Sequence, residues 1–304
     1  MPVEIRRVDG EADIEAFLTI RAAVDPEYPM TRESWDDAQT EPGRIDLLAC
    51  FDGVAAGCAF AGKLWNDPGS TTGFVSVRVL EAHRRRGLGT ALLGAVSGHV
   101  ESLGCTKLFS ITRAPELAAF LEHHGLVEVG RAQEVELELA SIDLGPPSLP
   151  GIEIVPVTEE LVPGMHAVAF EADADIPSAE PVVTGTLERW RERHLGPLAL
   201  WEQSFAAVAG GEVVGYAILG RAVPGVAEHW MTGVARDWRG RGIAKALKQA
   251  QIVAAREAGI EVLRTQNDLG NAPMRRVNEQ LGYRPSVEWI HLSGPVLGDV
   301  PDTM

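Results

Sequence analysis

The chain has 304 residues, 45% hydrophobic and 23% charged, a composition typical of a globular protein with one large domain or two of about 150 residues. Its formal net charge of −16 argues against DNA or RNA as a partner and favours cationic small molecules. The N-terminus, MPVEIRRVDGEADIEAF, shows no export signal, and no apolar run approaches the ~20 residues that span a bilayer. We therefore expect a cytoplasmic protein that does not bind a membrane.

The three cysteines, Cys50, Cys58 and Cys105, show no CxxC or Cys/His spacing. Their odd number and their spacing indicate neither a disulfide framework nor a zinc site. We expect buried thiols in a reducing compartment and no bound metal.

In chain order, each half reads as a strand, one or two helices, a hairpin, a strand, a Gly-rich turn, a helix, a strand, a helix and a strand. An Asp-Gly or Gly-Gly pair marks the turn of each hairpin, at 46–60 and 204–218. In the second half we expect a strand at 229–235, a helix at 243–259, a strand at 261–267 and a helix at 273–282. Strands that alternate with helices predict a mixed α/β sheet covered by helices.

The two halves are copies of one another. The motifs that recur in the same order are VEIRRV (3–8) with IEIVPV (152–157), Trp35 with Trp190, the two hairpins, RRRGLGTALL (84–93) with RGRGIAKALK (239–248), and LEHHGL (121–126) with NEQLGY (278–283). A fixed order at nearly constant spacing predicts a tandem duplication. The Pro- and Gly-rich stretch at 141–151 cannot continue a helix or a sheet ladder. We therefore expect domains at 1–143 and 152–304, joined by a linker at 144–151.

The Gly-rich turn in each copy is a candidate anion site. Glycine allows the backbone to approach a ligand closely, and the N–H groups of the turn and of the following helix converge on an anion. The turn lacks the GK[ST] end of a nucleotide-binding Walker A loop. Lys245 and Leu92 stand where a dinucleotide-binding loop needs glycine or alanine. An RNA-binding RGG tract is repetitive and disordered, whereas this turn lies between a strand and an amphipathic helix.

These residues resemble the GNAT superfamily of N-acetyltransferases. The pattern R-x-x-G-x-G/A between a strand and a helix is similar to the loop that binds the pyrophosphate of acetyl-CoA in that family. The segment TQNDLGNAPMRRVNEQLGY (265–283) is similar to a downstream motif of the family. The resemblance covers most of both halves and implies two tandem domains, each with a mixed, mostly antiparallel sheet flanked by helices.

The resemblance implies direct transfer of an acetyl group from acetyl-CoA to an amine. It also implies that the strand before the loop splays from its neighbour and pairs with the pantetheine arm, where an N–H can polarise the thioester carbonyl. The residues expected to bind acetyl-CoA in the first half are Val77, Arg78, Val79, Arg84, Arg85, Arg86, Gly87, Leu88, Gly89 and Thr90. Those in the second half are Thr232, Gly233, Val234, Arg239, Gly240, Arg241, Gly242, Ile243, Ala244, Asn267 and Asn271.

The candidate bases are Glu228 and His229, which precede the same strand in the second half. The alternative interpretation is an exposed acid at a strand end and a structural histidine. By resemblance, a tyrosine four residues before the Gly of the LGY end protonates the leaving thiolate. That position holds Asn278 here and Leu121 in the first half, so neither copy has the tyrosine. Asn278 can orient the thiolate or a water, and Tyr283 is the nearest tyrosine in sequence.

The second half carries more of the family's residues, so we expect it to catalyse, and the first half to bind acetyl-CoA or nothing. The intact loop of the first half leaves a second active site there as an alternative. The acidic stretch at 170–180 falls where the resemblance implies the acceptor wall, and its carboxylates would attract an ammonium group. The expected acceptor is the amine of a small molecule. A catalytically silent acyl-CoA-binding protein and a protein or peptide N-acetyltransferase remain as alternatives.

Overall fold

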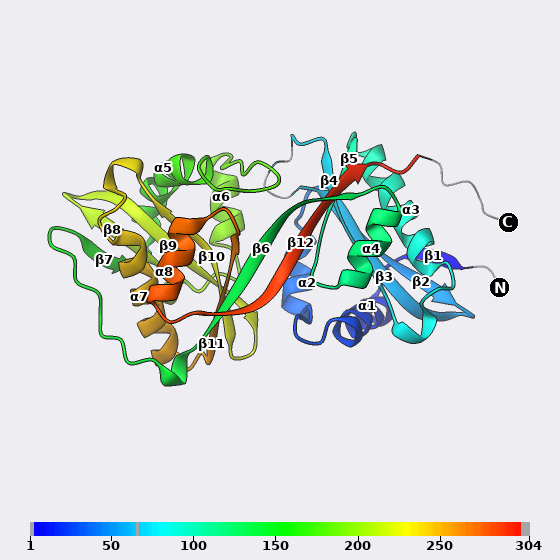
Figure 1. Cartoon of the computed structure of the whole chain (residues 1–304), viewed down its shortest axis with the longest axis horizontal. Coiled ribbons are helices and arrows are strands. Elements are labelled where there is room, and N and C mark those ends of the chain that lie inside the picture. Colours follow the sequence, from blue (N-terminus) through cyan, green and yellow to red (C-terminus); the bar gives the residue numbers. More distant parts are fainter. Residues whose placement is uncertain (1–2, 65–66, 68, 299–304) are drawn as a thin grey trace. The chain divides into compact units, whose positions relative to one another are not determined.

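The computed structural model describes residues 3–64, 67 and 69–298 and divides into two compact units (Figure 1). Unit 1 contains the chain up to Gly130 and the segment that begins at Ile290. Unit 2 contains Arg131–Trp289. The chain therefore leaves unit 1, completes unit 2 and returns to unit 1 at its end.

Unit 1 contains β1 (Glu4–Arg7), α1 (Glu11–Val24), α2 (Arg32–Ala38), β2 (Ile45–Phe51), β3 (Val54–Lys63), β4 (Thr72–Val79), α3 (Leu88–Ser102), β5 (Lys107–Thr112), α4 (Pro115–His123) and the end of β12 (Arg284–Pro295). Its strands follow the order β1-β2-β3-β4-β5-β12. Neighbours pair antiparallel except β4 and β5, which pair parallel. Helix α3 covers one face of the sheet and α1 the other.

Unit 2 contains most of β6 (Val127–Glu138), then β7 (Glu153–Pro156), α5 (Val162–Asp173), α6 (Leu187–His194), β8 (Phe205–Ala209), β9 (Glu212–Val223), β10 (Val226–Val234), α7 (Ile243–Glu257), β11 (Val262–Asp268), α8 (Ala272–Gln280) and the start of β12. Its strands follow the order β12-β6-β11-β10-β9-β8-β7, and β10 and β11 pair parallel. Helices α5 and α6 pack on one face and α7 on the other. The predicted mixed, mostly antiparallel sheet with flanking helices is confirmed.

The last strand of each sequence copy lies in the unit of the other copy. Strand β6 belongs to the first copy and pairs with β11 of the second, from Val262–Glu138 to Asp268–Ala132. Strand β12 belongs to the second copy, and its residues 290–295 pair with β5 of the first. The compact units therefore differ from the predicted domains at 1–143 and 152–304, because the repeat marks the copies and not their partners in space.

Local sequence signals explain why the two copies fold alike. The hydroxyl oxygens of Thr31 and Thr186 cap the first turns of α2 and α6, where each accepts a backbone N–H three residues on. The expected hairpin turns form at Asp52-Gly53 and Gly210-Gly211, where all four residues have positive φ. Such turns match the twist of the flanking strands.

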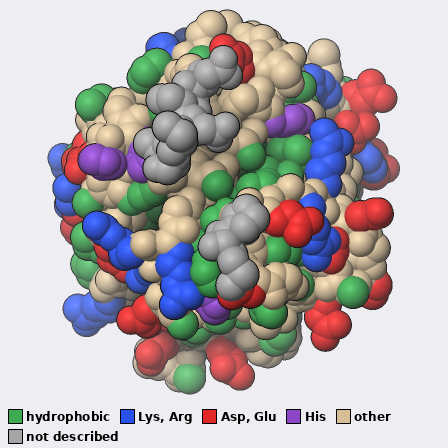
Figure 2. All heavy atoms as spheres, turned by 90° about the vertical axis from the view of Figure 1, so that its right-hand side faces the viewer, with side chains coloured by type: hydrophobic (Ala, Val, Ile, Leu, Met, Phe, Trp, Pro, Cys, Tyr) green, Lys and Arg blue, Asp and Glu red, His purple; other side chains and the backbone are tan. Residues whose placement is uncertain are grey.

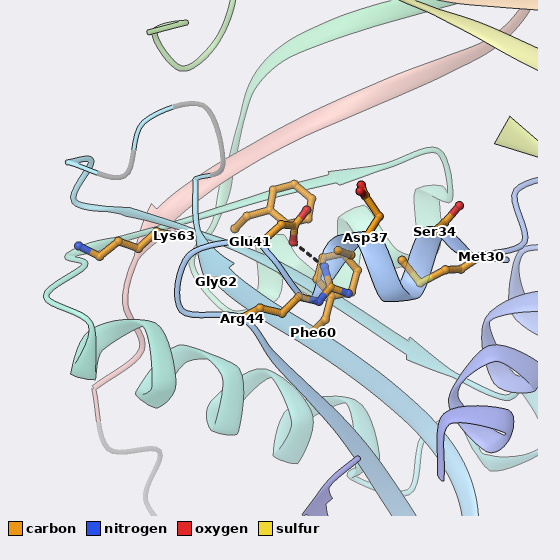
Figure 3. A pocket seen from close by; sticks show the side chains of 10 residues that line it. Met30, Ser34, Asp37, Glu41, Arg44, Phe60, Gly62 and Lys63 are labelled. Atoms are coloured by element: carbon orange, nitrogen blue, oxygen red, sulfur yellow. Dashed lines mark hydrogen bonds and ion pairs between the residues drawn. The ribbon is translucent and has the colours of Figure 1, made fainter. Parts of the chain in front are cut away.

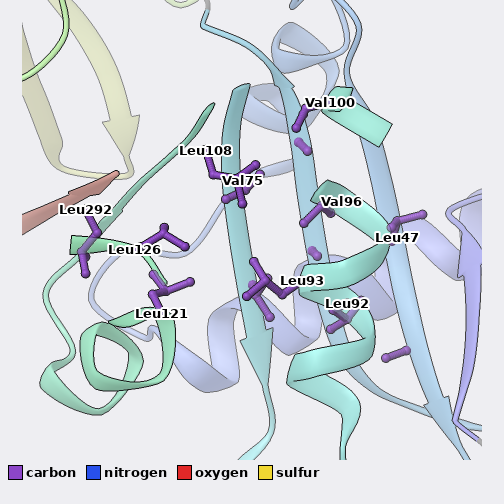
Figure 4. Packing of buried hydrophobic residues seen from close by; sticks show 14 of the residues in the cluster. Leu47, Val75, Leu92, Leu93, Val96, Val100, Leu108, Leu121, Leu126 and Leu292 are labelled. Carbon is purple, nitrogen blue, oxygen red and sulfur yellow. The ribbon is translucent and has the colours of Figure 1, made fainter. Parts of the chain in front are cut away.

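A cluster of apolar side chains fills the core of unit 1 between α3 and the sheet. Val75, Leu93, Val96 and Leu126 meet there in one cluster (Figure 4). Val75, Leu93 and Val96 are wholly buried, and Leu126 is 1% exposed. Burial of aliphatic side chains at this density is the main favourable term in folding.

The three cysteines are free thiols in unit 1, as predicted. Cys50, Cys58 and Cys105 are all buried. Burial raises the pKa of the Cys58 thiol to about 11 and also raises the pKa of Cys105. These two side chains therefore stay protonated and act as small apolar groups.

Candidate active site

The sheet of each unit opens between its two parallel strands. Strand β10 pairs with β11 only at residues 226–228, and β4 pairs with β5 only at residues 72–74. On its other side, β10 stays paired with β9 as far as Val234. The expected cofactor strands, 77–79 and 232–234, therefore present one backbone edge to an opening. An extended ligand can pair with such an edge as an added strand would.

Only the opening in unit 2 carries a bulge. The register of β10 against β9 shifts between His229 and Met231, whereas β4 runs against β3 without a shift. A bulge inserts one residue and re-aims the side chains that follow it. The extra residue, Trp230, is partly buried and packs against the hydrophobic cluster that α5 and α6 form with the sheet.

Gly220 makes room for that Trp230 side chain. A Cβ added at Gly220 would lie 1.8 Å from Cε2 of the indole. We expect Gly220→Ala to lower the free energy of unfolding by about 1–3 kcal/mol, because the ring must move within a packed site. Urea unfolding measures this change. Gly98→Ala is the control, because its Cβ meets open space in α3 and should stabilise by roughly 0.5–1 kcal/mol. Equal midpoints for wild type and Gly220→Ala would contradict the expectation.

The Gly-rich turns have the same backbone course in both units. Gly242 caps α7 with φ +83°, and Gly87 caps α3 with φ +85°. The earlier turn position with positive φ is Gly240 in unit 2 but Arg85 in unit 1. A left-handed conformation costs a non-glycine residue roughly 1–2 kcal/mol, so the turn of unit 1 is held against some strain.

The N–H groups at the start of each helix are the expected anion donors. The first helical hydrogen bond of α7 runs from Ala246 N–H to Gly242 O, at 3.0 Å. The N–H groups of Ile243 and Ala244 lie before it and have no partner within the helix. Ile243 is buried, as is Leu88 in unit 1, so these two predicted residues would offer their backbone and not their side chains. In the first turn of α3, the Thr90 hydroxyl lies 3.3 Å from Nε2 of His124.

The first arginine of each turn supports the turn itself. Arg239 Nε donates to the carbonyl of Val234 at 3.0 Å, and Arg84 Nε donates to that of Val79 at 3.2 Å. Arg241 lies over the ring of Trp238 and donates to the carbonyl of Asp237 at 3.0 Å. The arginines therefore brace the backbone that the anion site needs.

The acidic stretch at 170–180 contacts this turn. Asp175 accepts hydrogen bonds from Arg236 at 2.9 and 3.0 Å and from Arg239 at 2.7 Å. These two arginines lower the pKa of the Asp175 carboxyl. Glu171 accepts the backbone N–H of Arg236 at 2.7 Å. Asp173, the last residue of α5, is buried and accepts a hydrogen bond from the hydroxyl of Thr184. Two of the carboxylates expected to attract the acceptor, Glu171 and Asp175, thus hold the Gly-rich turn of unit 2 in place. The sequence did not predict these contacts.

Glu228 is the last residue of β10 that pairs with β11, so it stands where the strands separate. Burial and the nearby Glu134 raise the pKa of its carboxyl, and Arg264 opposes them. The residue in the same place in unit 1, the last that pairs with the parallel strand, is Phe74. Unit 2 therefore has a candidate base at the opening, and unit 1 has a phenylalanine.

His229 points to the face opposite Glu228, because successive residues of a strand alternate. Its Nδ1 lies 2.9 Å from Oε1 of Gln251 on α7, and its Nε2 bonds to the hydroxyl of Tyr283. Burial, together with Lys248, lowers the pKa of the imidazole well below its ordinary value. The imidazole of His229 is neutral, and both of its ring nitrogens are hydrogen-bonded on the face that carries α7. His229 therefore cannot share the role of Glu228.

The predicted asparagines are engaged with one another or with the backbone. Asn278 Nδ2 donates to Oδ1 of Asn267 at 2.6 Å, and Asn278 is only 2% exposed. Asn271 caps α8, where its Oδ1 accepts the N–H of Met274 at 3.3 Å. Asn271 therefore starts a helix, while Asn278 and Asn267 join α8 to the free edge of β11.

Unit 1 has a cavity of about 310 Å³ on the face of Phe74, below α2 (Figure 3). Arg44 crosses it, pairs with Glu41 and Asp46, and lies over the ring of Phe60 at 4.3 Å. The arginine that lines the cavity is thus engaged in ion pairs within the chain, and Phe74 stands at the position that matches Glu228.

The face of unit 1 shown in Figure 2 mixes basic and acidic side chains. Such a surface lacks the basic stripe typical of nucleic-acid binding. Within the described residues, none of the helices has the length and apolar character that a membrane crossing needs. No group of three or more His, Cys, Asp or Glu side chains in residues 3–64, 67 and 69–298 is placed to hold a metal ion.

Known proteins resemble this chain in sequence or in fold. A mycothiol acetyltransferase of Saccharomonospora viridis is 30% identical over 78% of this chain and 80% of its own length. One of Actinosynnema mirum is 27% identical over 79% and 80%. Among solved structures, a GCN5-related N-acetyltransferase of Sphaerobacter thermophilus gives a TM-score of 0.78 at 21% identity, covering 97% of this chain and 96% of that one. A tandem GNAT protein of the clavulanic acid biosynthesis pathway gives 0.77 at 20%, covering 97% and 99%.

The family model of the acetyltransferase (GNAT) family matches twice, at residues 13–126 and 171–283. The two matches fall on the two sequence copies and together cover most of the chain. Enzymes of this family use acetyl-CoA as the acetyl donor. The chain is a tandem N-acetyltransferase of the GNAT family, distantly related to mycothiol acetyltransferase.

Proposed function

We propose that unit 2 transfers the acetyl group of acetyl-CoA to the amine of a small molecule, with Glu228 as the general base. The observation that carries this proposal is the carboxylate at the opening between β10 and β11, where unit 1 has Phe74. The expected residues fit the donor: the N–H groups at the start of α7 suit its pyrophosphate, and the free edge of β10 suits its pantetheine arm.

Glu228 would take a proton from the bound ammonium group, and the neutral amine would then attack the thioester carbonyl. The raised pKa of Glu228 suits this work, because a stronger base accepts the proton more readily. A backbone N–H of residues 232–234 would stabilise the oxyanion. The turn of unit 1 keeps the same course, and we propose that it binds acetyl-CoA without catalysis or remains empty.

The acceptor of this chain is proposed from its relatives. The curated relatives are named for mycothiol, a small molecule rather than a protein. Negative charge on this chain, −16 in total, also favours a cationic acceptor.

The test is release of free thiol from acetyl-CoA with a panel of small amines, amino sugars and peptides with free N-termini. We expect turnover with small amines and little with peptides. Faster turnover with peptides would contradict the proposed acceptor class. Binding of acetyl-CoA without thiol release across the whole panel would contradict the proposed catalysis.

A further inference from the structure

The loop between α5 and α6, residues 174–186, closes back on the helix that it leaves. The Asp173 carboxylate accepts a hydrogen bond from the Thr184 hydroxyl at 2.8 Å. Nε2 of His166 lies 3.1 Å from the carbonyl oxygen of Gly185. Asp173 and His166 both belong to α5, so both ends of loop 174–186 are held on that helix.

The first residues of this loop contact the chain on both sides of the opening in unit 2. Asp175 accepts hydrogen bonds from Arg236 and Arg239, which follow the end of β10. Pro177 approaches the chain that follows β11, because a Cβ added at Gly270 would lie 3.6 Å from the Cβ of Pro177. The loop therefore has one contact beyond the end of each parallel strand.

These two contacts place the loop across the opening. The carboxyl ends of β10 and β11 lie at the same edge of the sheet, because the two strands run parallel. Only Ile176 lies between the two contact residues. Ile176 is half-buried, whereas Asp175 and Pro177 are exposed, which indicates that Ile176 faces the protein beneath the loop.

The opening of unit 1 is bridged in a different way. Asp25, which follows α1, accepts hydrogen bonds from Arg78 of β4 at 3.4 Å and from Nε of Arg113, just after β5, at 2.9 Å. These three side chains are only 14–19% exposed. Gly233 stands in the place of Arg78, since each lies just before the last residue of its strand, and it offers the loop no side chain.

The ion pairs that hold the loop in unit 2 are exposed instead. The side chain of Asp175 is 38% exposed, and that of Arg236 is 54% exposed. Exposed ion pairs contribute little stability and break readily. The loop in unit 2 can therefore open to admit an amine and close again, whereas the buried ion pairs of Asp25 hold unit 1 closed.

We propose that Asp175 is a positioning residue that holds loop 174–186 closed across the opening of unit 2 and keeps water from the thioester. This inference rests on the proposed function, in which acetyl-CoA lies along the free edge of β10. Water that reached the thioester would attack its carbonyl carbon, and the C–S bond would break with its electron pair passing to sulfur. The products would be acetate, the free thiol of CoA and a proton. Closure of a loop over an active site prevents such hydrolysis.

The kinetic test is Asp175→Asn, which keeps the side-chain shape and removes the charge that the two arginines hold. We expect hydrolysis of acetyl-CoA in the absence of amine to rise about 3- to 5-fold, a size typical of exposed ion pairs. The KM for the amine should rise by a similar factor, while kcat at saturating amine stays close to that of the wild type. A general loss of structure would instead lower kcat and hydrolysis together.

Asp143→Asn is the control, because Asp143 is an exposed residue in the stretch between the two copies and the charge change is the same. It should keep the wild-type rate of hydrolysis and the wild-type KM for the amine. Unchanged hydrolysis and an unchanged KM for the amine in Asp175→Asn would overturn the proposal.

A second variant tests whether Asp175 acts through its arginines. Arg236→Gln removes one partner of Asp175 and should also raise hydrolysis. In the double variant, Arg236→Gln should add nothing to the effect of Asp175→Asn, because the ion pair is already broken. Effects that multiply in the double variant would show that the two residues act independently and would overturn the proposal.

Hydrogen exchange of the unreacted protein separates this inference from the proposed function. The backbone amides of loop 174–186 should exchange faster in Asp175→Asn than in the wild type, and those of α7 should exchange equally in both. Acetyl transfer by the wild type with unchanged loop exchange in the variant would overturn the role of Asp175 alone. Faster loop exchange in the variant, with no acetyl transfer by the wild type to any amine, would support the contact and contradict the proposed function.

Discussion

Gly242→Glu is expected to lower kcat/KM for acetyl-CoA by about 10³-fold or more. Gly242 has φ +83° and caps α7. The substitution strains the turn by roughly 1–2 kcal/mol and aims a carboxylate at donors that should hold a pyrophosphate. A loss of about 4 kcal/mol in transition-state binding corresponds to 10³-fold. Thiol release and the binding of acetyl-CoA measure the effect.

The matched variant is Gly87→Glu, because Gly87 caps α3 with φ +85° and no atom lies within 4 Å of its added Cβ. The strain and the new charge are then the same in unit 1. We expect this variant to retain turnover, since unit 1 has Phe74 where unit 2 has Glu228. Turnover that survives Gly242→Glu and is lost in Gly87→Glu would place catalysis in unit 1.

Glu228→Gln is expected to lower kcat by about 10²–10³-fold, the usual contribution of a general base. Because only the carboxylate accepts a proton, the wild-type rate should rise as pH increases through the pKa of Glu228. Burial and Glu134 raise that pKa, so the rise should occur above the ordinary range of a glutamate. The amide cannot titrate, and the variant should lose this dependence. Rates measured from pH 4 to pH 9 with a saturating amine test both expectations.

Glu153→Gln is the control for this charge change, because Glu153 is an exposed residue on the edge strand β7. It should keep the rate and the pH profile of the wild type. A Glu228→Gln enzyme that keeps the acidic limb would exclude Glu228 as the base and leave a water or another carboxylate in that role.

Much of the fold could be predicted because its signals are local. The Asp52-Gly53 and Gly210-Gly211 turns specify hairpins through the backbone they require, and both formed. The Gly-rich turns predicted a helix start, and Gly87 and Gly242 are the caps. The repeated order of these motifs predicted two similar arrangements, which the structure also has.

The rest depends on contacts that spacing along the chain does not reveal. Glu228 and His229 looked like a pair of bases, but successive residues of a strand face opposite sides, so each meets different neighbours. The bulge that follows them at Trp230 has no signal in the sequence. Asp175 pairs with arginines 61 and 64 positions away, which no pattern near it indicates. The sequence did not predict that Lys248 is buried, because a lysine is expected to place its charged end in solvent even where its aliphatic stem packs on the core.

Because the two sequence copies exchange their last strands, neither copy can be separated from the other as a complete domain. Unit 2 needs residues 131–143 of the first copy to cover the edge of β11, and unit 1 needs the end of the second copy to cover β5. Both copies are therefore incomplete as separate proteins, each with an exposed strand edge. A protease that cut the proline-rich stretch at 144–148 would release neither unit. It would leave two complementing fragments, each of which supplies the closing strand of the other.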